Sequence, residues 1–169
     1  QRMLRLEAKA KYADVMERAL YNTVSASMSL DGKHYFYVNP LEVWPDACRQ
    51  NPGKRHVKPV RQKWFGCSCC PPNVARLLSS LEQYIYTCSG DTIYTHLFIG
   101  SDAVFPMEEG NVALVMRSGL PWNGQVRITV HPEHEQESFC LALRVPEWCC
   151  GKAALHVNGQ PIDYDIRDG

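Results

Sequence analysis

The hydrophobic periodicity of the chain changes once, near residue 83, and this change limits the folds that the chain can adopt. Before it, apolar residues recur three or four positions apart, as on one face of an amphipathic helix. In residues 1–28 these residues are Tyr12, Val15, Met16, Ala19, Leu20 and Val24. From Tyr84 onwards, short runs rich in β-branched and aromatic residues alternate with turn residues, which is typical of strands. The sequence therefore predicts a helical domain at residues 1–83 and a β domain at residues 84–169.

The β domain is predicted to be an antiparallel β-sandwich. Ser89-Gly90-Asp91 separates two β-rich runs, which is a hairpin signal. Four more runs with turn residues between them follow, at residues 111–121, 124–133, 137–148 and 153–163. Short strands at this spacing are typical of two sheets packed face to face.

The helical part contains two predicted helices, one within residues 1–28 and one that begins at Pro71-Pro72. Proline suits the first turn of a helix, where its missing N–H group costs little. The second helix has a predicted buried stripe of Val74, Leu77, Leu78 and Leu81. Between the helices we expect a short strand at residues 34–38 and a surface loop at residues 45–63. Two helices cannot enclose a core alone, and the chain does not open on Met, so we expect a fragment of a larger protein.

Charge and hydropathy exclude two classes of partner. The chain has 18 Lys and Arg against 18 Asp and Glu, and no basic run, which argues against nucleic acid as the main partner. Its apolar runs are too short to cross a bilayer, so no membrane partner is expected. The sequence does not indicate an oligomeric state.

Eight cysteines are present, and Cys67, Cys69 and Cys70 fall within four residues. Adjacent cysteines, which recur at Cys149-Cys150, form a disulfide only with backbone strain, so we expect reduced thiols and a cytoplasmic location. A closed zinc site would need a second pair of ligands at finger spacing, which the chain lacks. A helix N-terminus favours a reactive thiolate. Burial as small apolar side chains remains equally open.

Other side chains that could take part in catalysis or binding are scattered along the sequence. Glu42 is a candidate acid or base, although a structural hydrogen-bond acceptor is the simpler interpretation. The six histidines form no metal-binding pair, which favours strand-face or surface positions. Tyr35 and Tyr37 alternate on the predicted strand, where one could face a sugar ring, and Trp64 is close enough in sequence to line a pocket near the thiols.

Three segments, "RALYNTV", "DGKHYFYVNPLEV" and above all "CSCCPPNVARLLSSLEQYIYT", resemble the cysteine-dependent β-L-arabinofuranosidases of glycoside hydrolase family 127. The similarity extends to "LRVPEW" and "VNGQPI" in the strand-rich part, although these are less specific. The resemblance implies an (α/α)₆ barrel catalytic domain followed by β-sandwich domains. This chain would hold the last barrel helices and an incomplete β-sandwich domain.

The resemblance also implies roles for individual residues. Cys69 corresponds to the nucleophile, and Cys69 and Cys70 together correspond to zinc ligands. Tyr37 corresponds to a tyrosine near the arabinofuranoside substrate, whereas Cys67 receives no ligand role. The thiolate would attack the anomeric carbon and form a covalent intermediate, which water resolves with net retention.

The chain departs from the family pattern in what it lacks. The general acid glutamate and the Glu-x-Cys segment that supplies two zinc ligands would lie upstream of Gln1, so we expect the isolated chain to be inactive. The alternative is a non-catalytic carbohydrate-binding or structural β-sandwich module with inert cysteines. In that alternative, the sulfur atoms of Cys69 and Cys70 would be buried apart from each other.

Overall fold

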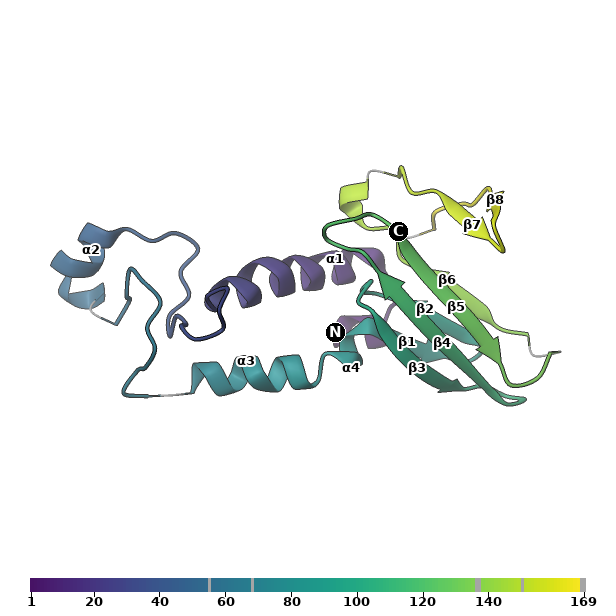
Figure 1. The fold of residues 1–169 in the computed structure, drawn as a ribbon, viewed down its shortest axis with the longest axis horizontal. Helices are drawn as coiled ribbons and strands as arrows, with labels where there is room; N and C mark the ends of the chain where they lie inside the picture. Colours follow the sequence, from purple (N-terminus) through teal and green to yellow (C-terminus); the bar gives the residue numbers. More distant parts are fainter. Residues whose placement is uncertain (55, 68, 136–137, 150, 168–169) are drawn as a thin grey trace. The chain divides into compact units, whose positions relative to one another are not determined.

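The computed structural model describes residues 1–54, 56–67, 69–135, 138–149 and 151–167 (Figure 1). The chain forms two compact units, one of Gln1–Val15 with Leu81–Gly169 and the other of Met16–Ser80. The α-helices precede Tyr86 and the strands follow it, as the periodicity predicts, with one 3₁₀ turn among the strands at Glu147–Cys149. The assignment of two domains that divide at residue 83 stays a prediction. No helix among the described residues is both long and apolar enough to cross a membrane.

The predicted N-terminal helix is shorter and less regular than its apolar pattern suggests. A 3₁₀ turn at Met3–Arg5 comes first, helix α1 covers Ala10–Arg18, and π-helical and 3₁₀ segments continue it through Ala19–Val24 and Ser25–Ser27. The predicted buried face is also partly wrong, because Val15 is 66% exposed whereas Glu17 is buried. The buried residues Ala13, Glu17 and Leu20 still follow helical spacing, so the face is real but includes a charged residue.

Residues 45–63, which we predicted to be a loop, begin with helix α2 at Pro45–Gln50. Pro45 occupies the first turn, and Asp46 there accepts a hydrogen bond from Arg49 at 2.6 Å, so the helix has its own start signal. Helix α3, Cys70–Ser79, begins at the two prolines as predicted. Its expected buried stripe is wrong, because none of its residues is buried and Leu78 is 44% exposed. The short helix α4, Glu82–Ile85, follows.

Within the described part of the chain, eight strands follow in three sheets (Figure 1). The first sheet has the order β1-β2-β6, with β1 at Tyr86–Ser89, β2 at Thr92–Thr95 and β6 at Cys140–Leu143. The second is the antiparallel sheet β3-β4-β5, with strands at Ser101–Pro106, Asn111–Ser118 and Val126–Pro132. A third pairs β7, Leu155–Val157, with β8, Gln160–Ile162.

The strand pairings agree with the local turn signals and depart from the prediction at one long-range contact. The β1–β2 hairpin is confirmed, and Gly90 turns it with φ of 58°. The sheet is not purely antiparallel, however, because β6 pairs with β2 in parallel. A parallel neighbour requires a long connection, and residues 96–139 provide one.

One hydrophobic cluster contains residues from both three-stranded sheets. Ile93 of β2 and Val112, Leu114 and Met116 of β4 are completely buried in it. Their alternation along β4 is the two-residue period of a strand with one face inward. The two sheets therefore contribute to a single core.

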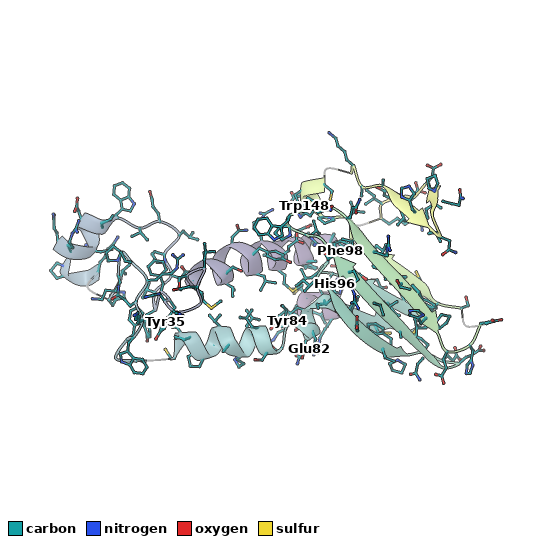
Figure 2. The ribbon with its side chains drawn as sticks, in the orientation of Figure 1. Tyr35, Glu82, Tyr84, His96, Phe98 and Trp148 are labelled. Atoms are coloured by element: carbon teal, nitrogen blue, oxygen red, sulfur yellow. The ribbon has the colours of Figure 1, made fainter. Side chains whose placement is uncertain are left out.

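Two buried polar residues of this unit, Arg144 and His96, each have a polar partner. Asp14 accepts hydrogen bonds from Arg144 Nη1 at 2.6 Å and from the Glu147 N–H at 3.1 Å. His96, labelled in Figure 2, is 5% exposed, and its Nε2 lies 2.8 Å from Thr87 Oγ1. Burial, with a smaller contribution from the charge of Arg144, lowers the pKa of His96 to about 4.

Candidate functional site

The adjacent cysteines lie at the beginning of helix α3. Cys69 is the residue that caps the helix, and Cys70 is its first residue. The Asn73 side chain donates a hydrogen bond of 2.9 Å to the Cys69 carbonyl oxygen, which ties the cap to the first turn. Cys69 is exposed and Cys70 is half-buried. The helix start thus holds two neighbouring thiols in different surroundings.

The two sulfur atoms are close but not bonded. Cys69 Sγ and Cys70 Sγ are 3.7 Å apart, far beyond the roughly 2.05 Å of a disulfide. Among the described residues, six cysteines carry free thiols, in agreement with the expected reduced state: Cys48, Cys67, Cys69, Cys70, Cys88 and Cys140. Cys150, and with it the Cys149-Cys150 pair, lies outside the described residues.

Tyr37 brings its hydroxyl group to the same place from a segment 32 residues earlier. The Cys69 thiol donates to Tyr37 Oη at 3.2 Å, and that hydroxyl donates to Cys67 Sγ at 3.8 Å. The structure therefore groups Tyr37, Cys69 and Cys70, which the sequence singled out, with Cys67 at the edge. We call these four residues the Tyr–Cys cluster.

Contacts within the Tyr–Cys cluster separate the two adjacent thiols in acidity. The Tyr37 hydroxyl can turn to donate to the Cys69 sulfur, and this hydrogen bond, followed by that of Cys70, lowers the pKa of Cys69. Burial, together with its contact to Cys69, raises the pKa of Cys70. The neighbouring thiols raise the pKa of Tyr37, which keeps its phenol protonated. Groups whose pKa values are pushed apart in this way suit different chemical roles.

The spacing of the two sulfur atoms fits a shared metal ion. Two thiolates bound to one tetrahedral zinc at roughly 2.3 Å would lie about 3.8 Å apart, close to the observed 3.7 Å. Within the described part of the chain, no group of three or more His, Cys, Asp or Glu has the geometry of a metal site. Cys69 and Cys70 could therefore supply two of the four ligands that zinc prefers.

An aromatic residue that the sequence did not single out supports the Tyr–Cys cluster. The Phe65 ring packs against Tyr35, labelled in Figure 2, with centroids 5.3 Å apart, and against Tyr37 with centroids 5.6 Å apart. The alternation of Tyr35 and Tyr37 hinted at a shared face, but nothing in the sequence indicated that Phe65 would cover it.

The remaining candidates lie outside the Tyr–Cys cluster. Glu42 is exposed, and within the described residues its carboxylate takes part in no hydrogen bond or ion pair. Trp64 is 72% exposed. His34 Nδ1 lies 3.6 Å from Asp31 Oδ1, and His96 is buried beside Thr87. The other histidines are exposed, as expected: His56, His131, His134 and His156.

Comparison with known families agrees with the resemblance. Residues 1–83 match the catalytic domain model of the GH127 β-L-arabinofuranosidases, and residues 92–169 match the middle domain model of the same family. The chain belongs to glycoside hydrolase family 127, which confirms the family inferred from the cysteine segment.

Individual relatives match along nearly the whole chain. A non-reducing end β-L-arabinofuranosidase of Bifidobacterium longum subsp. longum is 44% identical over 173 positions, which cover 100% of this chain and 26% of that protein. A GH127 β-L-arabinofuranosidase structure from Geobacillus stearothermophilus T6 has a TM-score of 0.85 and 54% identity, over 96% of this chain and 25% of its own. A further GH127 β-arabinofuranosidase structure has a TM-score of 0.78 and 32% identity, and the match covers 99% of this chain and 27% of that one. The chain thus spans about a quarter of the length of these relatives.

Proposed function

We propose that this chain is part of a retaining glycoside hydrolase that releases β-L-arabinofuranose from arabinofuranosides, with Cys69 as the nucleophile. One observation carries the proposal: an exposed thiol at a helix start, hydrogen-bonded to Tyr37 and 3.7 Å from a second thiol, in a chain of the GH127 family. The activity printed for the relatives supports the substrate class.

In this mechanism the Cys69 thiolate attacks the anomeric carbon of the arabinofuranoside. The new S–C bond forms as the glycosidic C–O bond breaks, and the leaving oxygen takes a proton from a carboxylic acid. Water then gives a proton to the resulting carboxylate and displaces the sulfur at the same carbon, so that two inversions give net retention. Tyr37 donates a hydrogen bond to the sulfur and borders the sugar. A cysteine thus replaces one of the two carboxylates that most glycosidases use.

Cys69 and Cys70 are proposed to hold a zinc ion, and the spacing of their sulfur atoms supports this role. When bound, zinc keeps the coordinated thiols deprotonated at neutral pH. The other two ligands and the carboxylic acid are proposed to come from residues upstream of Gln1. A chain with two of four ligands would bind zinc weakly, and we therefore propose that it is inactive alone.

The same reasoning extends to architecture and location. Residues 1–83 are proposed to be the last helices of an (α/α)₆ barrel, and residues 84–169 part of a β-sandwich domain whose two main sheets contribute to one core. A cytoplasmic location is proposed because six of the described cysteines, the adjacent Cys69 and Cys70 among them, carry free thiols.

The alternative, a non-catalytic carbohydrate-binding or structural module, is less well supported. It requires thiols that are buried apart among apolar side chains. Cys69 is instead exposed and contacts both Cys70 and the Tyr37 hydroxyl. These contacts favour the enzyme.

The decisive experiment compares Cys69→Ala with Cys48→Ala in the full-length protein that contains this chain. Hydrolysis of a β-L-arabinofuranoside should fall by at least about 10³-fold in Cys69→Ala, because the nucleophile is lost. Cys48 lies in helix α2 and is half-buried, so it controls for the loss of a thiol elsewhere. Equal activity of Cys69→Ala and wild type would refute Cys69 as the nucleophile, whereas a wild-type protein that does not hydrolyse the arabinofuranoside would favour the non-catalytic module.

A further inference from the structure

We propose that Phe65 is a positioning residue, which holds the Tyr37 ring so that its hydroxyl reaches the sulfur of Cys69. The inference rests on the proposed function, because it assigns Phe65 a part in the reaction of Cys69. Phe65 has no polar atom and therefore acts on the reaction only through the residues that it touches.

The backbone explains how Phe65 comes to lie against Tyr37. The Tyr35 N–H donates to the Gln62 carbonyl oxygen at 3.0 Å, and the Gln62 N–H donates back to Tyr35 at 2.9 Å. This reciprocal pair of hydrogen bonds anchors residues 62–67 beside the segment of the two tyrosines. Phe65 follows three residues after the anchor, and Cys67 follows two residues later.

The Phe65 ring packs against the rings of both tyrosines. Tyr35 forms a β-bridge with Gln62 and Tyr37 lies in a bend two residues later, and the Phe65 ring contacts both tyrosine rings. The intervening Phe36 has a different neighbour, the Arg61 guanidinium, 4.7 Å from its ring centroid. Among residues 63–67, Phe65 is also the one that is not exposed.

The position of the Tyr37 hydroxyl therefore depends on contacts at both ends of its side chain. The Tyr37 ring packs against the Phe65 ring with an interplanar angle of 39°. At the hydroxyl, it contacts Cys69 and Cys67. Cys69 itself is fixed independently by the start of α3 and by Asn73. Removing the Phe65 ring should thus release Tyr37 while leaving the nucleophile in place.

The test uses Phe65→Leu, Phe65→Tyr, Tyr37→Phe and the double variant Phe65→Leu/Tyr37→Phe in the full-length protein. We expect Phe65→Leu to lower kcat for a β-L-arabinofuranoside at least about tenfold with little change in KM, because a misplaced group costs rate more than binding. Phe65→Tyr keeps the ring and should restore kcat. On the Tyr37→Phe background, Phe65→Leu should have little further effect.

Phe36→Leu is the matched control, since it removes the ring of the residue between the two tyrosines, which lies against Arg61. It should leave kcat within about twofold of wild type. An equal loss of kcat in Phe36→Leu and Phe65→Leu, or an unchanged effect of Phe65→Leu on the Tyr37→Phe background, would overturn the inference.

A second readout does not depend on glycosidase activity. The rate at which iodoacetamide alkylates Cys69, followed by peptide mass spectrometry, should change in the same direction and by a similar factor in Phe65→Leu and Tyr37→Phe. If only Tyr37→Phe changes this rate, Phe65 does not position Tyr37. If Cys69→Ala keeps full activity, the proposed function fails, and the alkylation rates still decide whether Phe65 holds Tyr37.

Discussion

A fall in pH from about 7.5 to about 5 should destabilise the sheet-containing unit through protonation of His96. The imidazole is 5% exposed and its pKa is lowered from 6.5 to about 4, whereas in the unfolded chain it returns to its ordinary value. Between these two pKa values the unfolded chain binds a proton that the folded chain does not bind. The stabilising contribution of neutral His96 is therefore fully present above a pH of about 6.5 and is lost as the pH falls towards 4.

The size of the effect follows from the same two pKa values. At a pH of about 5, the linkage relation gives a loss of about 2 kcal/mol in the free energy of unfolding, compared with almost none at about 7.5. With a urea dependence of roughly 2 kcal/mol per molar, the unfolding midpoint should fall by about 1 M.

The assay is urea unfolding at both pH values, for wild type and for His96→Gln. Glutamine can keep a hydrogen bond to Thr87 but does not titrate, so the variant should lose most of the pH dependence between 5 and 7.5. The reasoning is refuted if wild type and His96→Gln show the same shift in midpoint between the two pH values.

Three further predictions follow from other described contacts. Asp14→Asn should lower the free energy of unfolding by about 3 kcal/mol, because it leaves a buried arginine facing a neutral amide. Asp46→Asn, which breaks an exposed ion pair, should lower the free energy of unfolding by less than about 1 kcal/mol. Urea unfolding measures both variants, and equal losses in Asp14→Asn and Asp46→Asn would contradict the reasoning. Gly90→Ala should lower the free energy of unfolding by about 1–2 kcal/mol, because the φ of Gly90 is 58° and an L-residue is strained there. Gly124→Ala should be nearly neutral, because the space around Gly124 is open. Thermal melts in which Gly124→Ala is the more destabilised variant would contradict the hairpin geometry. Cys70→Ala should reduce zinc retained by the full-length protein, measured by elemental analysis, and unchanged zinc would exclude Cys70 as a ligand.

The parts of the fold that the sequence predicted are those that depend on neighbouring residues. Ser89-Gly90-Asp91 and Pro71-Pro72 determine a hairpin and a helix start through their own backbone preferences. The parallel pairing of β2 with β6 joins Thr92 to Cys140, and no local preference specifies that partner. The burial of Glu17 was missed for a similar reason, since helical periodicity assigns charge to the solvent side unless tertiary packing overrides it.

The residues of the candidate site also differ in whether they could be identified from a short segment of the sequence. Cys69 and Cys70 were identifiable because the motif, the helix start and the family resemblance coincide in one short segment. The alternation of Tyr35 and Tyr37 did not say which of the two faces the site, and only the resemblance selected Tyr37, as its contact with Cys69 spans 32 residues. Phe65 was missed because aromatic residues pack in cores far more often than they support a site, and its contact with Tyr37 depends on the Tyr35–Gln62 backbone pairing.

The two adjacent thiols provide the last prediction, because identical side chains one residue apart differ here only in their surroundings. Cys69 is exposed, and the Tyr37 hydroxyl lowers its pKa, whereas burial raises the pKa of Cys70. Since the thiolate is the reactive form, iodoacetamide at near-neutral pH should alkylate Cys69 before Cys70 once a chelator has removed any zinc. Peptide mass spectrometry of the full-length protein measures the order of alkylation directly. Tyr37→Phe should reduce the difference in alkylation rate between Cys69 and Cys70. Faster alkylation of Cys70 would mean that the helix start does not distinguish a nucleophile from its partner, and the roles proposed for the two residues would have to be exchanged.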